Sequence, residues 1–382
     1  SASRRIVTIC SSVNRLFFMT SFLRWKPFSQ VSTGPKITGQ VSHTRRVRHA
    51  QFEGHQWLTT PRTKGVTVSH NLEAELSDLL GTMDWVPIYL TEHPEPGAGG
   101  LSIRQFFLAL RDDEPMLMEF SAKLADQIIA YCLPRKRLAK AVQKHLNNPS
   151  DLAAAMAALR REARKAFQKY REEYPARSGE GGEMLAYVFV EHFLRAPMAI
   201  AKMHAKTNTT MPVFGADGVH VRYLSETDEL EVIYLESKVH ATIGSAARDA
   251  SKSIDEFRQG QQRTVELRLA LDLGNFDQLE SDAQQALEEF LDPYSGTRTG
   301  NRLDRHACLL AYSEPSFEKA VGPNSKESLL QAFNEGCNDR RRIVSDAYKG
   351  RQLPEDKIMT FVLGLPSVAD FRSEFEKALS NG

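Results

Sequence analysis

Residues 231–240 read EVIYLESKVH, an apolar run typical of a central strand that carries two opposite charges near its end. Side chains alternate between the two faces of a strand, so Glu236 and Lys238 are expected to point to the same face. Burying an unpaired ion in a covered sheet costs several kcal/mol. A divalent cation held by the carboxylate, with the ammonium close by, would compensate for this burial. The triplet alone is weak support, because an acid-x-Lys triplet is expected by chance about three times in a chain of this length and average composition.

A second acid precedes this strand in an expected hairpin. The stretch MPVFGADGVHVRYL (211–224) predicts a strand that contains Asp217. Gly215 and Gly218 flank this acid and allow backbone or ligand to approach closely. The polar turn SETDE joins the two strands. Antiparallel neighbours joined by a turn would place Asp217 and Glu236 near the same edge of a sheet.

Two predicted helices flank the hairpin. The stretch EMLAYVFVEHFL (183–194) is apolar on nearly all sides, which predicts a buried helix with Glu183 in its first turn. Three acids and a lysine could then converge. Arg248 and Lys252 lie four residues apart in the helix after the strand, so they share a face and could contact phosphates. Each of these residues also has a plainer explanation. The helix dipole favours an acid such as Glu183 near a helix N-terminus in any case. The strand charges could form a structural ion pair at the sheet rim, and Arg248 and Lys252 could be ordinary solvated residues.

The rest of the pattern predicts a central sheet covered by helices, which is an α/β arrangement. Downstream of the hairpin, helices are expected at 244–262, 264–291 and 326–350 and from Ser367, and strands at 306–314 and 356–366. Upstream, a strand is expected at 83–90, and helices at 102–113, 115–133, 134–146 and 151–173. We therefore predict a basic, disordered leader (1–65), a mainly helical N-terminal module (66–175) and a second domain (176–382), with a Gly-rich hinge at 174–182.

Charge and composition exclude several classes of protein. The predicted leader holds eleven Lys and Arg against one acid, Glu53, although the whole chain carries only +1. The remaining residues are therefore net acidic and do not form a general polyanion-binding surface. No run approaches the roughly 20 apolar residues that cross a bilayer, so a cytoplasmic protein is expected. The four cysteines lie far apart without a CxxC pair, which argues against a zinc site and a disulfide framework. The sequence has no GxxxxGKS/T loop, so we do not expect it to hydrolyse ATP.

The order of these motifs resembles the PD-(D/E)xK nuclease superfamily: a helix with Glu183, a strand with Asp217, and then Glu236-x-Lys238 on the next strand, followed by a helix. The resemblance implies a restriction-endonuclease-like core of topology αβββαβ. Within that superfamily, GEMLAYVFVEHFL, FGADGVH and LESKVH together resemble the HamA family, whose members are nuclease subunits of the Hachiman anti-phage system. The anti-phage protein AbpA also represents this family. The similarity covers roughly residues 66–382. The sequence departs from the superfamily pattern at one position, because Ala216 stands where the superfamily often has Pro before the strand acid.

The resemblance implies roles for the motif residues. Asp217 and Glu236 would be ligands of Mg²⁺ or Mn²⁺, with the Ser237 carbonyl lining the same pocket. Glu183 would bind a second metal or hold a water ligand. Lys238 would position the attacking water or stabilise the transition state.

The resemblance also implies a function and a partner. The expected function is that of a metal-dependent DNA nuclease, the effector of an anti-phage complex that is released or loaded by a separate ATP-dependent superfamily 2 helicase, HamB. Arg248 and Lys252 would then contact DNA. Two alternatives stay open: a noncatalytic subunit in which the nuclease fold serves as a scaffold for the helicase, and an RNase that uses the same metal site.

Overall fold

A six-stranded mixed sheet forms the centre of the protein, in the strand order β1-β2-β8-β7-β6-β5. The computed structural model describes residues 65–93, 101–173, 179–203, 215–294, 301–319 and 325–381. The predicted leader (1–65) lies outside them apart from its last residue, and so does most of the predicted hinge (174–182). Residues 66–382 form one compact unit. The strands are β1 (Leu90–His93), β2 (Ser102–Leu108), β5 (Gly218–Leu224), β6 (Glu229–His240), β7 (Arg302–Ser313) and β8 (Ile358–Leu365).

The middle of the sheet is parallel and its two edges are antiparallel. Strands β6, β7, β8 and β2 run parallel to one another, whereas β5 pairs antiparallel with β6 and β1 pairs antiparallel with β2. The parallel strands are covered on both faces, which explains their nearly continuous apolar sequences. A small separate hairpin, β3 (Leu110–Arg111) and β4 (Glu114–Pro115), turns at Asp112 and Asp113, whose positive φ angles suit such a turn.

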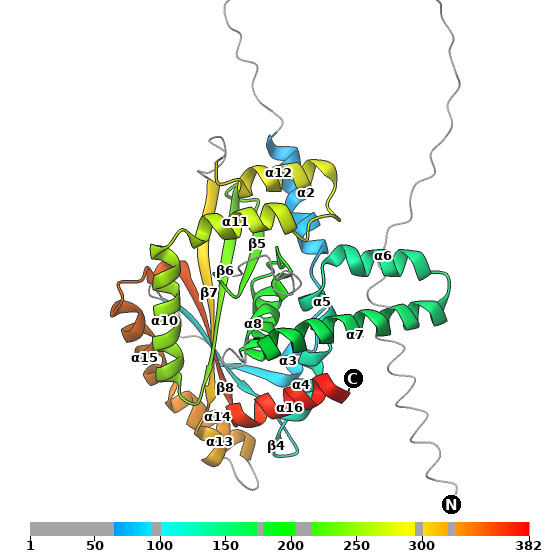
Figure 1. Ribbon diagram of the computed structural model, residues 1–382. Helices are drawn as coiled ribbons and strands as arrows, with labels where there is room; N and C mark the ends of the chain where they lie inside the picture. Colours follow the sequence, from blue (N-terminus) through cyan, green and yellow to red (C-terminus); the bar gives the residue numbers. More distant parts are fainter. Residues whose placement is uncertain are drawn as a thin grey trace, which may run out of the picture. The chain divides into compact units, whose positions relative to one another are not determined.

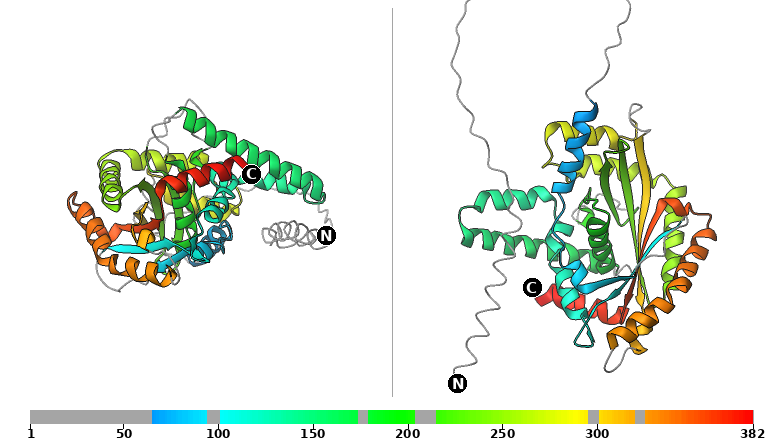
Figure 2. Two further views of the ribbon diagram at one scale, coloured as in Figure 1. Left: turned by 90° about the horizontal axis from the view of Figure 1, so that it is seen from below. Right: turned by 180° about the vertical axis from the view of Figure 1, so that it is seen from behind.

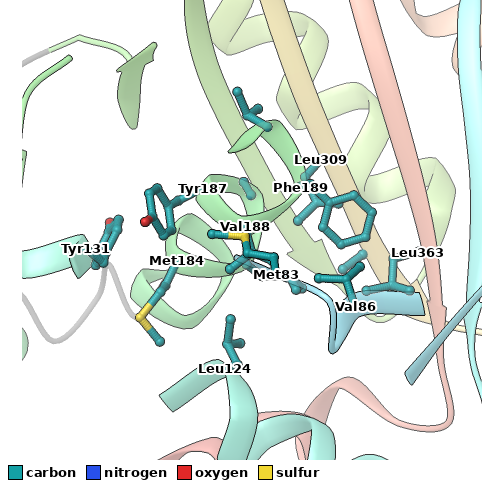
Figure 3. Packing of buried hydrophobic residues seen from close by; sticks show 14 of the residues in the cluster. Met83, Val86, Leu124, Tyr131, Met184, Tyr187, Val188, Phe189, Leu309 and Leu363 are labelled. Atoms are coloured by element: carbon teal, nitrogen blue, oxygen red, sulfur yellow. The ribbon is translucent and has the colours of Figure 1, made fainter. Parts of the chain in front are cut away.

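Helices cover both faces of the sheet (Figure 1). One face is covered by α8 (Glu180–Phe193), with α4 (Leu117–Ala125) and α16 (Val368–Asn381) beside it. The opposite face is covered by α10 (Ile243–Gln259) and α15 (Cys337–Lys349). Figure 3 shows the first of these cores, where Phe189 of α8 lies near Leu309 of β7 and Leu363 of β8.

The other helices extend these layers. Helices α2 (Gly65–Asp78), α11 (Gln262–Leu273) and α12 (Ser281–Leu291) pack on β5 and the first half of β6. Helices α6 (Arg135–His145) and α7 (Pro149–Glu173) form a hairpin that projects away from the sheet (Figure 2). The remaining helices are α3 (Val86–Tyr89), α5 (Ile128–Cys132), α13 (Ser316–Lys319), α14 (Ser325–Glu335) and the 3₁₀ turn η4 (Glu355–Lys357). No helix in the described ranges is both long and apolar enough to span a membrane.

The mixed α/β class is confirmed, but several predicted elements are wrong. Residues 102–113, predicted as a helix, form β2 and part of the β3–β4 hairpin, so the predicted helical module contributes strands to the central sheet. The strand predicted at 83–90 begins only at Leu90, after the short helix α3. The single helix predicted at 264–291 is two helices, because the chain leaves the helix at Gly274, where an added Cβ would lie 2.4 Å from the Ala270 carbonyl oxygen.

Candidate active site

The strand β6 carries an ion pair between Lys238 Nζ and Glu236 Oε1 near its C-terminal end. In the parallel register these residues lie opposite Leu310 and Cys308 of β7, which belong to the core beneath α10 and α15. The pair therefore faces α10. The side chain of Glu236 is 11% exposed and that of Lys238 is 25% exposed, so both charges are largely withdrawn from water.

The two partners respond differently to this burial. Burial raises the pKa of Glu236, and the attraction of Lys238 together with a hydrogen bond from Ser253 of α10 offsets this only in part. Burial lowers the pKa of Lys238, but Glu236 and Asp217 outweigh it, and the net pKa of Lys238 is raised. The difference follows from depth, because the more exposed ammonium loses less hydration than the carboxylate. Lys238 thus stays protonated, whereas the pKa of Glu236 is raised because the protein compensates the charge of an ionised Glu236 only in part.

Asp217 lies directly before β5, not within a strand as predicted, and its backbone and side chain both contact β6. Its amide donates to the Leu235 carbonyl (2.8 Å), and its Oδ2 accepts a hydrogen bond from the Ser237 amide (2.8 Å). The carboxylate therefore lies beside the peptide that joins Glu236 to Ser237. This is the juxtaposition that the hairpin pattern predicts.

The buried thiol of Cys308 lies close to all three charges. Its pKa is raised to about 12, first by burial and further by Glu236 and Asp217, while Lys238 opposes the shift. The ion pair of Lys238 with Glu236 and the hydrogen bond of the Ser237 amide to Asp217 place the three charged groups in the same small region of the sheet. The acid directly before β5, the acid of β6 and the predicted lysine are thus brought together.

Glu183 approaches this region from the other side of the sheet. It lies in the first turn of α8, and its Oε2 accepts a hydrogen bond from the Tyr131 hydroxyl (3.0 Å). The helix begins in close contact with β6, because a Cβ on Gly182 would lie 2.5 Å from Val239 Cγ2 and 2.8 Å from Ser237 Oγ. Those two strand residues face away from Glu236.

The charge of Glu183 nevertheless affects the opposite face. It adds to the raised pKa of Glu236, after the larger effect of burial. Glu183 therefore lies close enough to influence the ion pair, but it reaches the strand from the α8 side while Glu236 and Lys238 face α10. Its membership of a common metal site stays a prediction.

The oxygen donors on β6 and before β5 fit a magnesium-like ion. Within the described ranges, no three His, Cys, Asp or Glu side chains are grouped so that they could hold a metal. Mg²⁺, however, is commonly bound through only one or two carboxylates and keeps several waters. Asp217 and Glu236 supply two such carboxylates, and the incompletely compensated charge of Glu236 would be satisfied by a cation. The donor set therefore fits Mg²⁺ or Mn²⁺ bound by these two residues.

Arg248 and Lys252 lie exposed on α10, as their spacing predicts. Arg248 Nη2 donates to Ser245 Oγ (3.2 Å), and Lys252 Nζ lies 3.8 Å from Glu256 Oε1. These contacts are typical of a solvated helix face, and the contact of both residues with DNA stays a prediction. Sequence reasoning missed Tyr131 and Ser253, because each meets its glutamate only after the chain folds and no local pattern marks it.

One comparison with known proteins matches most of the chain. The sequence model of a protein family described as HamA matches residues 84–379. This range includes Glu183, Asp217, Glu236 and Lys238. No curated protein matches the chain.

Proposed function

The chain belongs to the HamA family, and from this premise we propose that it is the cytoplasmic DNA nuclease subunit of a Hachiman anti-phage defence system. The partner in this proposal is the helicase HamB, which would use ATP to engage DNA and to release or load the nuclease. The net acidic charge that follows the first 65 residues supports this division of labour, because a nuclease without a broad positive surface would depend on another subunit to bring it substrate.

A restriction-endonuclease-like core is part of the proposal. After α8, the chain makes an antiparallel bridge between Met198 and His220 of β5, and β5 then pairs antiparallel with β6. Helix α10 follows, and β7 returns parallel to β6. This order of a helix, three antiparallel segments, a helix and a parallel strand supports the αβββαβ topology implied by the motifs.

The chemistry would rest on Asp217, Glu236 and Lys238. A divalent cation bound by the two carboxylates would supply Lewis-acid chemistry, lowering the pKa of water and offsetting negative charge on the scissile phosphate. Lys238, whose pKa is raised, would keep its proton, so it would orient the attacking water or stabilise the phosphate in the transition state and would not act as a general base. Glu183, across the strand, would hold a second cation or a water.

One observation carries this proposal. The Asp217 carboxylate is held by the Ser237 amide, next to a buried glutamate whose charge is incompletely compensated. Perturbed carboxylates that converge with an ammonium are typical of sites that bind metal and act on phosphate esters. A purely structural ion pair would need no second acid fixed beside it.

A noncatalytic scaffold is the second candidate function. It is favoured by the absence, within the described ranges, of a group of three or more potential metal-ligating side chains. In this case the charges on β6 would be a structural pair, and the chain would serve as a platform for the helicase.

Cleavage assays distinguish the two candidates. The purified chain is incubated with Mg²⁺ and supercoiled plasmid, alone and with HamB and ATP, in parallel with single-stranded and duplex RNA. We expect DNA cleavage that Glu236→Gln and Lys238→Met abolish while binding to HamB is kept. Glu231→Gln is the matched control, because Glu231 is a buried glutamate on the same strand that pairs with Arg222 and Arg305.

Each other outcome contradicts a specific part of the proposal. Cleavage by Glu236→Gln at the wild-type rate would show that the site is wrongly assigned. A wild-type chain that binds HamB but cuts no nucleic acid under any of these conditions would favour the scaffold. Cleavage of RNA alone would contradict the assignment of DNA as the substrate.

A further inference from the structure

The turn that carries Asp217 is held by a buried ion pair from two other parts of the chain. Lys202, which follows α8, donates from Nζ to the Ala216 carbonyl (2.5 Å) and to Glu266 Oε1 of α11 (2.5 Å). The Lys202 side chain is 4% exposed and that of Glu266 is 0% exposed. The carbonyl that Lys202 binds belongs to the residue immediately before Asp217.

Glu266 also packs directly against the backbone of this turn. Gly215 has φ +141°, in the region that favours glycine, and a Cβ at this position would lie only 2.0 Å from Glu266 Oε1. No other residue type fits here without moving the carboxylate. The ion pair therefore contacts the turn at two consecutive residues, Gly215 through the carboxylate and Ala216 through the ammonium.

The opposite side of the turn is fixed by β6. The Asp217 amide donates to Leu235, and its carboxylate accepts from the Ser237 amide. The segment that carries Lys202 is itself bound to β5, through a hydrogen bond from the Ala199 amide to the Val219 carbonyl (2.7 Å). Asp217 is thus held between two supports, one from strand β6 and one from the buried ion pair.

The ion pair of Lys202 with Glu266 is not expected to add much to the stability of the folded protein. Replacing a buried ion pair by apolar residues of similar volume is often neutral or stabilising, because desolvation offsets the attraction. Within the described ranges Glu266 Oε2 has no hydrogen-bond partner, so the carboxylate is not even fully satisfied. What apolar residues cannot supply is a donor for the Ala216 carbonyl. The clearest consequence of the pair is the placement of the turn.

We propose that Lys202 and Glu266 are positioning residues, which hold the turn 215–217 so that the Asp217 carboxylate stays beside Glu236 in the arrangement that binds a divalent cation. The metal-binding part of this inference rests on the proposed function, whereas the placement of the turn can be measured without it. Neither residue is part of the predicted set of site residues.

The test uses a double variant that removes the pair and a control that disturbs a different one. Lys202→Met/Glu266→Leu replaces the ion pair by apolar side chains of similar size. Glu314→Gln disturbs a different buried ion pair, that of Glu314 with Arg340. Glu314 directly follows β7, and Arg340 lies in α15. Lys202→Arg keeps a charged donor and serves as the conservative variant. All are compared with the 382-residue chain.

Two measurements are made on each protein. Hydrogen exchange, followed by mass spectrometry of peptides that cover the Asp217 and Ser237 amides, reports the placement of the turn. Electron paramagnetic resonance of free Mn²⁺ reports binding of the cation. In the double variant we expect faster exchange at both amides and an increase of about tenfold in the half-saturating Mn²⁺ concentration, without a lower melting temperature. Glu314→Gln should lower the melting temperature without either effect, and Lys202→Arg should behave more like the wild type than the double variant does.

The outcomes separate this inference from the proposed function. Wild-type exchange at both amides in the folded double variant would overturn the positioning role, whether or not the chain cuts DNA. Faster exchange in the double variant, with no Mn²⁺ binding by any protein including the wild type, would support the placement of the turn and overturn its metal-binding purpose. Should the double variant fail to fold, Glu266→Gln is measured in the same way, and unchanged exchange there overturns the inference.

Discussion

Replacing Glu236 by Gln is expected to make the protein more stable while it removes the central negative charge of the candidate site. Burial raises the pKa of Glu236 above its ordinary value of 4.5, although Lys238 pairs with it. The folded chain therefore holds the proton more tightly than the unfolded chain does, so the ionised carboxylate weakens the folded state at neutral pH. Glutamine has nearly the same shape and carries no charge, and Lys238 keeps the attraction of Asp217.

The size and pH dependence of the effect follow from this linkage. One unit of raised pKa corresponds to about 1.4 kcal/mol. We expect Glu236→Gln to raise the free energy of unfolding at pH 8 by about this amount for each unit by which folding raises the pKa of Glu236. The wild-type free energy of unfolding should decrease as the pH rises from 4.5 through the raised pKa. The advantage of the variant should therefore shrink as the pH falls toward 4.5, because a protonated glutamate and a glutamine are both neutral.

Glu231→Gln on the same strand should have the opposite sign. Glu231 is also buried, but it pairs with Arg222 (2.5 Å) and Arg305 (2.8 Å). Removing its charge leaves two guanidinium groups without their carboxylate, which should lower the free energy of unfolding by about 3 kcal/mol. Urea unfolding, followed by the fluorescence of the buried Trp85 between pH 5 and pH 8, measures both variants. Equal destabilisation by the two substitutions at pH 8 would refute the reasoning that burial dominates at Glu236.

Three further predictions concern the surroundings of the site. Gly182→Ala should lower the free energy of unfolding by about 1 kcal/mol, because its methyl group would lie 2.5 Å from Val239 Cγ2. Gly244→Ala in α10 should raise the free energy of unfolding by up to ~1 kcal/mol, because its methyl group would have no contact closer than 3.3 Å. Equal urea midpoints for the two variants would contradict this. Because the pKa of Glu236 is raised, protons should begin to compete with Mn²⁺ at a pH above 4.5, so the Mn²⁺ dissociation constant should start to increase above that pH as the solution is acidified. A dissociation constant that starts to increase only at or below pH 4.5 would contradict the effect of burial. The Cys308 thiol, with its pKa raised to about 12, should resist iodoacetamide at pH 8 in the native protein and react in urea, and rapid native labelling seen by mass spectrometry would contradict its burial.

The centre of the candidate site could be predicted because its determinants are local. The strands β5 and β6 form a hairpin, so the positions of Asp217 and Glu236 follow from one turn and from the alternation of side chains. The charged pair in an otherwise apolar strand marks the end of β6 that carries the candidate site. The side from which Glu183 arrives could not be predicted in the same way, because it depends on how α8 packs against the strand.

Strand β2 shows why part of the fold could not be predicted. Its sequence SIRQFFL has no regular alternation, because Phe106, Phe107 and Leu108 are all buried by the layers on both faces. A short apolar run of this kind is compatible with a buried helix as well as with a strand. Its parallel partner β8 lies about 250 residues further along the chain. Gln105 Oε1 accepts a hydrogen bond from Arg340 Nε of α15 (2.7 Å). Only tertiary packing decides between the two structures.

The buried pair of Lys202 and Glu266 was beyond prediction for a related reason. The two residues are 64 positions apart and come from separate elements. Glu266 lies in a helix whose sequence has no unusual feature at that position. The glycine at 215 gives a partial signal, since a positive φ and the lack of space for a side chain both require it, but the sequence does not identify the group that fills the space.

A crystal structure of the protein soaked in Mn²⁺, with anomalous-scattering data, shows whether Asp217 and Glu236 bind one ion. We expect an anomalous peak at about 2.1 Å from carboxylate oxygens of both Asp217 and Glu236, with Lys238 beside it. A soaked crystal with both carboxylates ordered and no ion between them, or with Mn²⁺ bound only elsewhere, would contradict it.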